Sequence, residues 1–418
     1  MKQQHVVIVG GGVIGLSCAY YCAKAGLQVT VVDRNPESRD GCSFGNAGMI
    51  VPSHFVPLAA PGMVALGLKW MWNPESPFYI RPRLDASLIA WAYRFWRSST
   101  AAHVRASAPL IRDLSLASRS AFEELAELPG NDFGLVRKGL LMLCRTPHGL
   151  EEEAKGAEQA RKLGIPADVL DPAAAAALEP GVRMDIAGAV HYPLDCHLSP
   201  DRFMGGLKRE LDRLGARFLW SSEALDWKSS GQRIERVITT NGEVAGDEFL
   251  LCGGSWSPST AAKLDLRLPI QAGKGYSLTL PSPRRLPTLC SIFTEARVAV
   301  TPMGSSLRFG GTMELSGLDE GIDPVRVRGI IKAVSRYYPE FGPADFEGIQ
   351  PWRGLRPCSP DGLPYIGRTG CRSNLTLATG HAMMGLSLAP VTGKIVAGIL
   401  TGQPAGFESR MLSPDRHS

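Results

Sequence analysis

The sequence lacks the marks of several protein classes. It has no Cys-x-x-Cys pair, and its nine cysteines are odd in number and dispersed, so neither a metal site nor a disulfide framework is indicated. No apolar run approaches the roughly 20 residues that a membrane-spanning helix needs. No leader peptide is expected, because a strand is predicted to begin at His5. We therefore expect a protein of a reducing compartment, the cytoplasm.

Dense basic segments are also missing. The chain carries 45 lysines and arginines against 40 aspartates and glutamates, and the net charge of +5 is spread along the sequence. A nucleic-acid-binding surface would need clustered basic residues, so no nucleic-acid partner is expected. The mild excess is compatible with an anionic small molecule or with peripheral contact to the inner face of a membrane.

What is present is typical of a globular chain. Hydrophobic residues make up 44% and charged residues 20% of the 418 positions, which exclude disorder and fibrous structure. This length corresponds to two or three domains of about 150 residues each. We find neither an internal repeat nor a flexible linker, so the domains are expected to be interleaved.

Secondary-structure patterns alternate along the chain. Helices are predicted mostly within 63–128 and over 151–163, 172–178, 324–337 and 390–400, with a further helix starting at Ser199-Pro200-Asp201 and ending near 214. Strands are predicted over 5–9, 27–32, 140–144, 217–220, 233–239, 247–252 and 375–378, and several more over 268–315. The fold class is therefore α/β.

The N-terminal segment contains the most informative motif. A buried strand, His5 to Val9, leads into Gly10-x-Gly12-x-x-Gly15 and then into a helix that ends at Gly26. In this arrangement the first glycine permits a tight turn, the second lets a pyrophosphate approach, and the third allows close helix–strand packing. The helix start at Val13 and Ile14 offers free N–H groups to phosphates.

An acidic residue completes this unit. Asp33 ends the second strand near the expected offset of about 20 residues, where a carboxylate binds the ribose of a dinucleotide. Arg34 follows and faces either an adenine or solvent. The fingerprint predicts a dinucleotide site, but by itself it does not distinguish NAD from FAD.

Four segments together resemble the FAD-dependent D-amino-acid oxidase superfamily, which includes glycine oxidase, sarcosine oxidase and bacterial D-amino-acid dehydrogenases. They are the N-terminal unit, Gly41–Ile50, Gly354–Pro357 with Pro360–Gly367, and Gly380–Gly385 with Pro390–Gly393. The Ser-Phe-Gly-Asn-Ala-Gly form at 43–48, with Ala59-Ala60-Pro61-Gly62 after it, is most similar to the D-amino-acid dehydrogenases.

The resemblance implies a Rossmann-like FAD-binding domain interleaved with an α+β substrate domain on a large mixed sheet. It assigns residues 1–56, 196–262 and 353–418 to the first domain and residues 57–195 and 263–352 to the second. Cys358 does not match the spacing of relatives that attach flavin covalently, so non-covalent FAD is expected.

The resemblance also implies which residues contact the cofactor. A loop after the second strand is expected to pass along the pyrophosphate and flavin, and a second glycine turn lies under the cofactor. The last segment brings a helix start to the flavin pyrimidine, where its dipole stabilises negative charge. The residues so assigned are Ser43, Asn46, Ala47, Gly48, Met49, Ala224, Gly253, Trp256, Gly380, Met383, Met384, Gly385, Leu386 and Ser387.

Arg356 is the predicted substrate clamp. It matches the Gly-Leu-Arg-Pro arginine that holds the substrate carboxylate in the family, and a guanidinium can bind both carboxylate oxygens. A structural arginine is the alternative, with Arg353 as the second candidate for the clamp. Tyr276 is expected over the active site or in the core, while His54 and His381 are assigned lower-ranked roles near the amine and the flavin.

The substrate and the electron acceptor are less determined. Met383 and Met384 replace polar residues of glycine-oxidase-like sequences, which favours a larger apolar or cyclic substrate such as D-proline or a hydroxylated D-proline over glycine. The acceptor is a respiratory-chain quinone or oxygen. An aromatic cluster is interpreted as helix packing, with a membrane-facing patch as the alternative; it comprises Trp70, Trp72, Trp91, Tyr93, Phe95 and Trp96.

Overall fold

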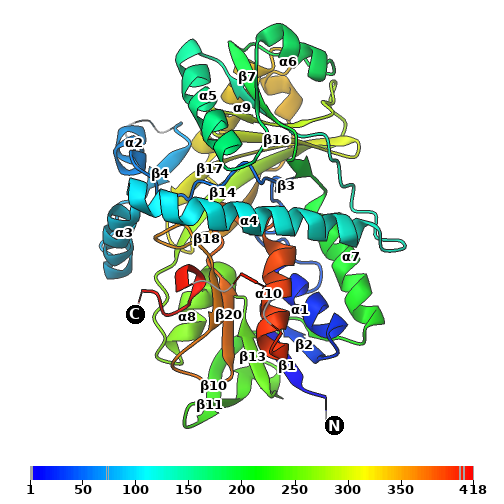
Figure 1. Cartoon of the computed structure of the whole chain (residues 1–418), viewed down its shortest axis with the longest axis vertical. Coiled ribbons are helices and arrows are strands. Elements are labelled where there is room, and N and C mark those ends of the chain that lie inside the picture. Colours follow the sequence, from blue (N-terminus) through cyan, green and yellow to red (C-terminus); the bar gives the residue numbers. More distant parts are fainter. Residues whose placement is uncertain (1–2, 72, 74, 404–405, 408–409, 418) are drawn as a thin grey trace.

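Two β-sheets organise the molecule, one in each lobe (Figure 1). The computed structural model describes residues 3–71, 73, 75–403, 406–407 and 410–417. Trp72 of the predicted aromatic cluster lies outside the described residues. The mixed α/β fold predicted from the sequence is confirmed.

The first sheet has six strands in the order β19-β20-β13-β1-β2-β9. All neighbouring strands are parallel except β19, which is antiparallel to β20. The strands are β1 (His5–Val9), β2 (Gln28–Val32), β9 (Arg217–Leu219), β13 (Glu248–Leu251), β19 (Tyr365–Arg368) and β20 (Leu375–Thr379). Their β-branched, buried sequences are typical of a sheet that is covered on both faces.

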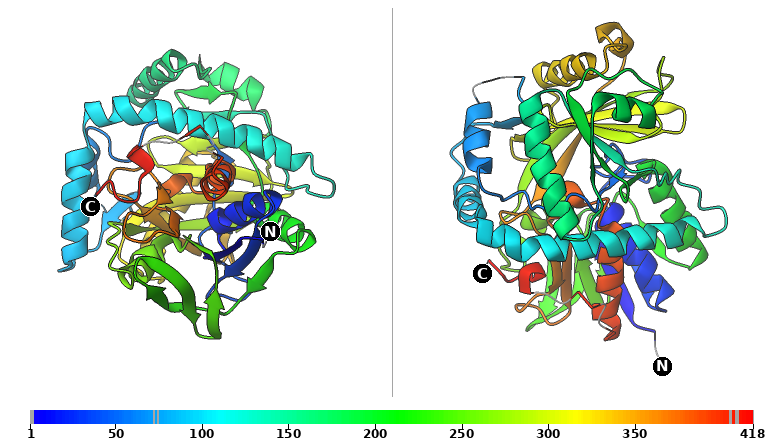
Figure 2. Two further views of the ribbon diagram at one scale, coloured as in Figure 1. Left: turned by 60° about the horizontal axis from the view of Figure 1, so that its bottom comes forward. Right: turned by 45° about the horizontal axis from the view of Figure 1, so that its top comes forward.

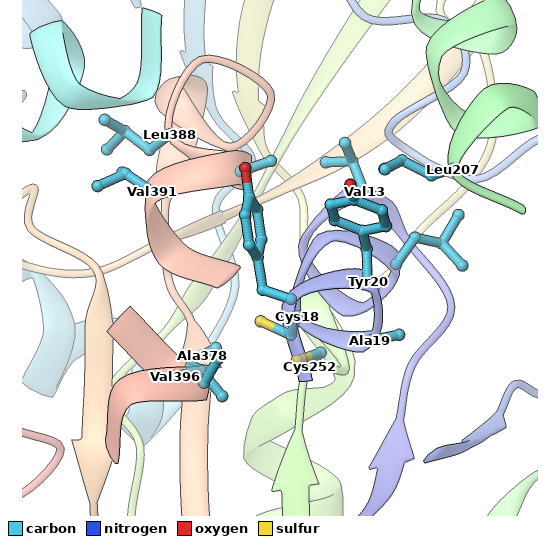
Figure 3. Close-up of a cluster of buried hydrophobic side chains, with 14 of the residues drawn as sticks. Val13, Cys18, Ala19, Tyr20, Leu207, Cys252, Ala378, Leu388, Val391 and Val396 are labelled. Carbon is cyan, nitrogen blue, oxygen red and sulfur yellow. The ribbon is translucent and has the colours of Figure 1, made fainter. Parts of the chain in front are cut away.

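Alternate residues of β1 pack on opposite layers. Val6 and Ile8 contact the layer of α1 (Val13–Lys24), α7 (Pro200–Arg213) and α10 (Ala389–Thr401). Figure 3 shows this layer, with Tyr20 of α1, Leu207 of α7 and Val391 of α10. Val7 and Val9 face the second layer, which comprises a small sheet of β10 (Ala224–Ser230), β11 (Arg233–Thr239) and β12 (Gly242–Ala245), and α8 (Ser257–Ala262).

Glycine lets α10 lie directly on α1. A Cβ atom at Gly393 would stand 2.6 Å from the backbone oxygen of Ser17, so any side chain there would separate the two helices. The α1 helix ends as predicted, since Gly26 has φ +85° and takes the left-handed position that follows many helices.

The second sheet has nine strands, eight of them in the order β18-β14-β17-β16-β15-β5-β7-β6, and β4 also pairs with β17. Their bounds are β4 (Phe78–Ile80), β5 (Leu140–Cys144), β6 (Asp168–Leu170), β7 (Gly188–Tyr192), β14 (Gln271–Leu280), β15 (Cys290–Phe293), β16 (Val298–Met303), β17 (Ser306–Leu315) and β18 (Trp352–Cys358). The helices α5 (Pro147–Lys162), α6 (Pro172–Leu178) and α9 (Pro324–Tyr337) pack in this lobe.

The long helix α4 (Ala101–Ala126) crosses the molecule between the two lobes (Figures 1 and 2). Its Leu114 and Phe122 belong to the hydrophobic core of the first lobe, and its Ala108 belongs to a core cluster with β5 and β7. One helix thus contributes to the cores of both lobes.

Two shorter helices precede α4, namely α2 (Met63–Trp70) and α3 (Ala86–Ser98). The aromatic side chains of α3 divide into two sets. Trp91 and Phe95 stack with ring centroids 5.0 Å apart, and Trp91 Nε1 donates to the Cys358 carbonyl, whereas Tyr93 and Trp96 are exposed. The helix-packing interpretation therefore fits Trp91 and Phe95 but not Tyr93 and Trp96. None of the helices in the described part of the chain is both long and apolar enough to cross a membrane.

Several predicted elements are confirmed, including the strand 140–144 and the helices 172–178 and 324–337. The helix predicted from 151 begins at Pro147, because the Thr146 hydroxyl caps it by accepting the Gly149 N–H. Strands β4 and β18 were not predicted. Strand β4 has only three residues, and β18, with the sequence Trp-Arg-Gly-Leu-Arg-Pro-Cys, lacks alternating apolar residues, so their pairing with the larger sheet makes them strands.

The six strands of the first sheet all fall within the segments proposed for the FAD-binding domain. The proposed division at 353 lies inside β18, which pairs with β14 of the larger sheet. Two short strands, β3 (Met49–Ile50) and β8 (Cys196–His197), pair with each other. Short 3-10 helices occur at Gly254–Trp256, Pro343–Phe346, Ala382–Met384 and Arg410–Leu412.

Candidate functional site

A cavity of about 470 Å³ opens where β1 and β2 end and α1 begins. Fifteen of the residues assigned from the sequence line it. They are Gly10, Gly12, Val13, Ile14, Asp33, Arg34, Ser43, Asn46, Ala224, Gly253, Trp256, Arg356, His381, Gly385 and Leu386. Six separate stretches of the chain thus meet around one space.

Other assigned residues lie beside the cavity without lining it. Ala47 and Met49 pack in an apolar cluster, Ser387 Oγ accepts the Val51 N–H, and Met383 is 50% exposed. The remaining members of this group are Gly15, Gly48, Gly380, Met384 and, farther away, Tyr276 and His54. Gly48 and Gly380 have φ +74° and +77°, so they shape the turns that carry their neighbours.

The glycines at the start of α1 have separate roles. Gly10 has φ +112°, and a Cβ there would lie 2.4 Å from the Cys252 carbonyl oxygen; a Cβ at Gly15 would lie 1.8 Å from the Gly10 carbonyl oxygen. Gly12 is different, because its Cβ would meet only Ser43 Oγ, at 3.5 Å. Gly10 and Gly15 therefore allow backbone segments to approach each other closely. Gly12 leaves open space, a bare cradle, at the N-terminus of α1, which suits a phosphate group.

Asp33 is held by the loop that it faces. Its Oδ2 accepts the Gly11 N–H at 2.6 Å and its Oδ1 accepts the Asn35 N–H at 2.8 Å. Each carboxylate oxygen has two lone pairs, so each retains one for a ligand hydroxyl. The Arg34 guanidinium stacks on Trp256, 3.6 Å from the ring centroid, which places this cation on the cavity wall and not in open solvent.

Arg39 is a cavity residue that the sequence did not reveal. Its Nη2 donates to the Gly11 carbonyl at 2.7 Å, and its guanidinium lies 4.2 Å from the centroid of a Trp220 ring. Its Nε is buried without a partner, and burial lowers its pKa although Asp33 opposes this. A cation so close to the glycine turn fits an anionic ligand, but no local motif marks it.

Arg308 was missed for a similar reason. From β17 its Nη1 donates to the carbonyls of Phe44 and Asn46, at 3.0 and 2.8 Å. This arginine ties the loop at 43–49 to the larger sheet. Its role depends on a contact between residues more than 260 positions apart, which no sequence spacing reports.

The two candidate clamp arginines differ in their partners. Arg353 forms ion pairs with Asp40 and Glu320. Arg356 lies flat over Gly275, where a Cβ would stand 2.3 Å from its nitrogens, and its Nη1 donates to the Thr312 carbonyl at 2.8 Å. In the part of the chain that the structure describes, no carboxylate forms an ion pair with Arg356. Most of its five N–H donors are thus available to a ligand.

Tyr276 lies on the opposite face of β14. Its ring is 1% exposed and packs in the core with Ile330 and Val334 of α9. The hydroxyl donates to Glu314 Oε2 at 2.8 Å and accepts the Asp323 N–H, and burial raises the pKa of the phenol. The structure therefore places Tyr276 in the core, the alternative left open by the sequence, and not at the cavity.

His54 begins a buried hydrogen-bond chain. Its Nδ1 lies 2.9 Å from Ser53 Oγ, and the Ser53 hydroxyl donates to Asp195 Oδ2 at 2.5 Å. Asp195 also accepts the Ser53 N–H, and burial raises its pKa to about 7. Burial lowers the pKa of His54 to about 4. A neutral imidazole is thus linked through a hydroxyl to a carboxyl group that titrates near neutrality.

His381 lines the cavity as a neutral ring. Its Nε2 lies 3.0 Å from the Thr392 hydroxyl oxygen, and that hydroxyl donates to the Leu388 carbonyl. The Nε2 atom must therefore carry the hydrogen, and the buried Nδ1, which has no partner, is a free acceptor. Burial lowers the pKa of this ring to about 3.

Comparison with known proteins identifies this architecture. The family model described as FAD dependent oxidoreductase matches residues 5–399. The chain is 35% identical to a D-amino acid dehydrogenase of Rhizorhabdus wittichii, with 99% of this chain and 100% of the relative covered. It is 34% identical to a D-amino acid dehydrogenase of Cereibacter sphaeroides, with 99% and 97% covered.

Solved structures share the fold. Glycine oxidase from Geobacillus kaustophilus superposes with a TM-score of 0.79 at 24% identity, covering 100% of both chains. L-proline dehydrogenase from P. horikoshii has a TM-score of 0.74 at 17% identity, covering 99% of this chain and 98% of the other. The bare Gly12 cradle, the Asp33 carboxylate and the cations on the cavity wall fit a flavin dinucleotide. The chain therefore belongs to the family of FAD-dependent oxidoreductases.

Proposed function

We propose that this protein is a dehydrogenase that oxidises D-amino acids or cyclic D-imino acids of the D-proline or hydroxy-D-proline type. Bound FAD supplies the hydride acceptor, flavin N5, for the hydrogen on the substrate Cα. The observation that carries the proposal is Arg356, a cavity arginine whose guanidinium has one backbone partner and no paired carboxylate in the described structure. The full-length relatives named D-amino acid dehydrogenase support the same reaction.

Arg356 orients the substrate through its carboxylate. A guanidinium offers two parallel N–H groups to the two carboxylate oxygens, so it fixes direction as well as position. The Gly275 backbone beneath it and the Thr312 carbonyl beside it hold the guanidinium in place. Holding one end of a small substrate in this way aligns its Cα–H bond, which is the main contribution a protein can make to hydride transfer.

An apolar cluster beside the cavity, none of whose residues named here lines it, is the basis for proposing a substrate larger than glycine. Met49 belongs to an apolar cluster against which Ala47, Ala299 and Met384 pack. Methionine adapts to irregular apolar shapes, so a cyclic or branched substrate side chain that reaches this cluster would gain from burial. We therefore assign a preference for apolar or cyclic D-substrates over glycine.

The chain from His54 to Asp195 is the proposed acceptor of the amine proton, which would reach His54 through water because His54 does not line the cavity. The substrate must lose a proton from its ammonium group before hydride transfer. With Asp195 ionised, His54 Nδ1 donates to Ser53 and its Nε2 is an acceptor. His54, with a pKa of about 4, passes the proton on, and Asp195, with a pKa of about 7, retains it.

The pH dependence of flavin reduction tests this path. Because the acceptor must be ionised, the rate should rise with pH through about 7, the pKa of Asp195. In Asp195→Asn that rise should disappear, and the rate at pH 8 should fall by about 100-fold, the lower end of the range for loss of a positioned proton acceptor. Stopped-flow reduction across pH 5 to 9 measures both; an unchanged profile in the variant contradicts the role of Asp195.

FAD is proposed to be held without a covalent bond. Cys358 is fully buried and lies outside the residues that line the cavity. Cys42 does line the cavity, but burial raises the pKa of its thiol, so little thiolate is present for attachment. Precipitation of the holoprotein with acid should release all the flavin into the supernatant.

An anaerobic screen of flavin reduction tests the function as a whole. D-amino acids, cyclic imino acids and N-methyl amines are mixed with the holoprotein, and bleaching of the flavin band is followed. Reduction by D-proline or apolar D-amino acids, with slow reoxidation by air and fast reoxidation by a quinone, is expected. Rapid peroxide formation with N-methyl amines would instead indicate a sarcosine-type oxidase, and no bleaching with any amine would indicate a non-catalytic flavin subunit.

The outer face of α3 is the proposed contact with an anionic membrane, where the quinone acceptor would be reached. Ile89, Tyr93 and Trp96 recur at helical spacing and are 64%, 56% and 61% exposed. Arg97 lies beside them, 5.9 Å from the Tyr93 ring centroid. An apolar face edged by cations is typical of helices that lie on the inner surface of a membrane.

Negative charges introduced on this face should weaken vesicle binding. Ile89→Glu with Trp96→Glu adds two negative charges and removes two apolar anchors, so co-sedimentation with phosphatidylglycerol vesicles should fall at least about tenfold. Turnover with a water-soluble dye acceptor should be unaffected. Val169→Glu, an exposed position on β6, is the matched control. Equal sedimentation of the double variant and the unmodified protein would contradict the membrane contact.

A further inference from the structure

A second cavity lies between α3 and the C-terminal segment, residues 410–417. Its volume is about 480 Å³, and it is lined by Tyr93, Arg94, Arg97, Ser98, Arg416 and His417. Figures 1 and 2 both show the C-terminal end beside α3. These residues do not line the cavity at the glycine turn, so the second cavity is not part of the cofactor and substrate site.

Arg416 forms a fixed wall of the second cavity. Its Nε and Nη2 atoms donate to the two carboxylate oxygens of Asp361, at 2.7 and 3.0 Å, and its other N–H groups donate to three backbone carbonyls. Its guanidinium also stacks on Tyr365, 3.8 Å from the ring centroid. A guanidinium has five N–H donors, and the protein uses all five here. Asp361 offsets the charge as well, so Arg416 supports the cavity and leaves ligand contacts to other residues.

Arg94 and Arg97 are the cations that are available to a ligand. They are three residues apart on α3, so they lie on the same side of the helix. Arg94 Nη1 donates to the Ala90 carbonyl over a long 3.4 Å, and the Arg97 guanidinium lies 5.9 Å from the Tyr93 ring centroid. Among the residues that the structure describes, no carboxylate forms an ion pair with either arginine. Two guanidinium groups without a paired carboxylate on one cavity wall indicate an anionic ligand.

This pair of arginines suits a phosphate group. A guanidinium binds phosphate oxygens through two parallel N–H bonds, which a lysine ammonium cannot do. The oxygens of a phosphate are arranged tetrahedrally, so two guanidinium groups can contact the same phosphate from different directions. Ser98 lines the cavity beside Arg97, and its hydroxyl is a further possible donor.

The position of the cavity favours a phospholipid as the source of the phosphate. Tyr93 lines the cavity, and it also belongs to the exposed apolar face of α3 with Ile89 and Trp96. The ring centroids of Tyr93 and Trp96 are 6.1 Å apart. Tyrosine and tryptophan side chains settle at the headgroup level of a bilayer. With this face on a membrane, lipid phosphates would therefore lie at the level of the cavity.

We propose that this cavity binds the phosphate group of an anionic phospholipid headgroup. Arg94 and Arg97 contact the phosphate oxygens, and Arg416 holds the wall that the C-terminal segment contributes. The choice of a lipid as the source rests on the proposed contact of α3 with a membrane, whereas the phosphate site itself does not. Such a site adds recognition of one chemical group to a general attraction between a cationic helix and an anionic surface.

A water-soluble, short-chain phosphatidylglycerol tests the site without a membrane. Calorimetric titration of the FAD-loaded protein should show saturable binding of the lipid. Arg94→Gln with Arg97→Gln should raise the Kd at least about tenfold, as for the loss of hydrogen bonds to a charged group. Arg94→Lys with Arg97→Lys keeps both charges but removes the planar forks, so its Kd should lie between those of the unmodified protein and the glutamine variant.

Arg267→Gln with Arg328→Gln is the matched control. Both arginines are exposed and lie outside the second cavity, so this variant loses the same two charges. Its Kd for the short-chain lipid should change by less than about threefold, because distant exposed charges are screened. FAD content and turnover with a water-soluble dye should be unchanged in all three double variants, since none of the four arginines lines the FAD cavity.

Three outcomes separate the hypotheses. If the glutamine variant of Arg94 and Arg97 binds the short-chain lipid as tightly as the unmodified protein, the phosphate site is overturned. If inorganic phosphate binds through the two arginines and the short-chain lipid does not, the lipid is overturned as the ligand. If the short-chain lipid binds through them but the unmodified protein does not sediment with phosphatidylglycerol vesicles, the phosphate site stands and the membrane contact of α3 is overturned.

Discussion

Arg356→Lys should lower kcat/KM for the D-amino or imino acid substrate about 100- to 1000-fold, chiefly through KM, with FAD still bound. Lysine keeps one positive charge but offers a compact ammonium in place of the planar fork, so the bidentate contact with a carboxylate is lost. The factor corresponds to about 3–4 kcal/mol of lost binding. Flavin content should be preserved, since Arg356 reaches the cavity from β18 and not from the glycine turn.

Steady-state kinetics and acetate titration measure this effect. Arg353→Lys is the comparison, because Arg353 lies on the same strand but pairs with Asp40 and Glu320. We expect its KM to change by less than about threefold, as for other exposed ion pairs. If Arg353→Lys raises KM and Arg356→Lys does not, the two arginines have exchanged roles.

Gly15→Ala should produce a protein that retains almost no FAD. An alanine Cβ at this position would stand 1.8 Å from the Gly10 carbonyl oxygen, a backbone atom that can move only if the whole turn moves. Overpacking of this kind costs at least about 1–3 kcal/mol. The displaced turn would also misdirect the N–H groups at the start of α1, which suit the pyrophosphate.

Flavin absorbance after gel filtration and thermal unfolding with added FAD measure the outcome. The unmodified protein should gain stability with FAD concentration, because a ligand that binds only the folded state shifts the equilibrium, and Gly15→Ala should lose this gain. Gly342→Ala is the matched control, since a Cβ there meets nothing within 4 Å and its φ is −130°. Full flavin retention in Gly15→Ala would contradict the role of the close contact.

The conformation of the dinucleotide turn depends on residues that are neighbours in the sequence, so the sequence predicts it well. The turn, the helix and the strand ending at Asp33 follow one another within 29 residues, 5–33, and each is determined by short-range geometry such as the tight turn at Gly10. The confirmed family follows from the order of four such segments. Local steric rules of this kind need no knowledge of distant contacts.

The lining of the cavity was less predictable. Arg39 and Arg308 reach it or support it through backbone carbonyls of other segments, and neither belongs to a motif. Tyr276 is the opposite case, because a residue that was a candidate for the site lies in the core. Its neighbour Gly275 faces Arg356, but successive residues of a strand point to opposite sides, so Tyr276 enters the core beside α9.

By itself, the sequence determined the α/β class, the nucleotide-binding turn and the candidate arginines, because these depend on residue type and short spacing. Only the tertiary structure decided which arginine is free, since pairing of Arg353 with Asp40 joins positions 313 residues apart. The tertiary structure also shows a β-bulge in β17 opposite Gly275, at which the Thr312 carbonyl accepts a hydrogen bond from Arg356. Strand register and long-range pairing create these features, and neither is encoded in any one segment of the chain.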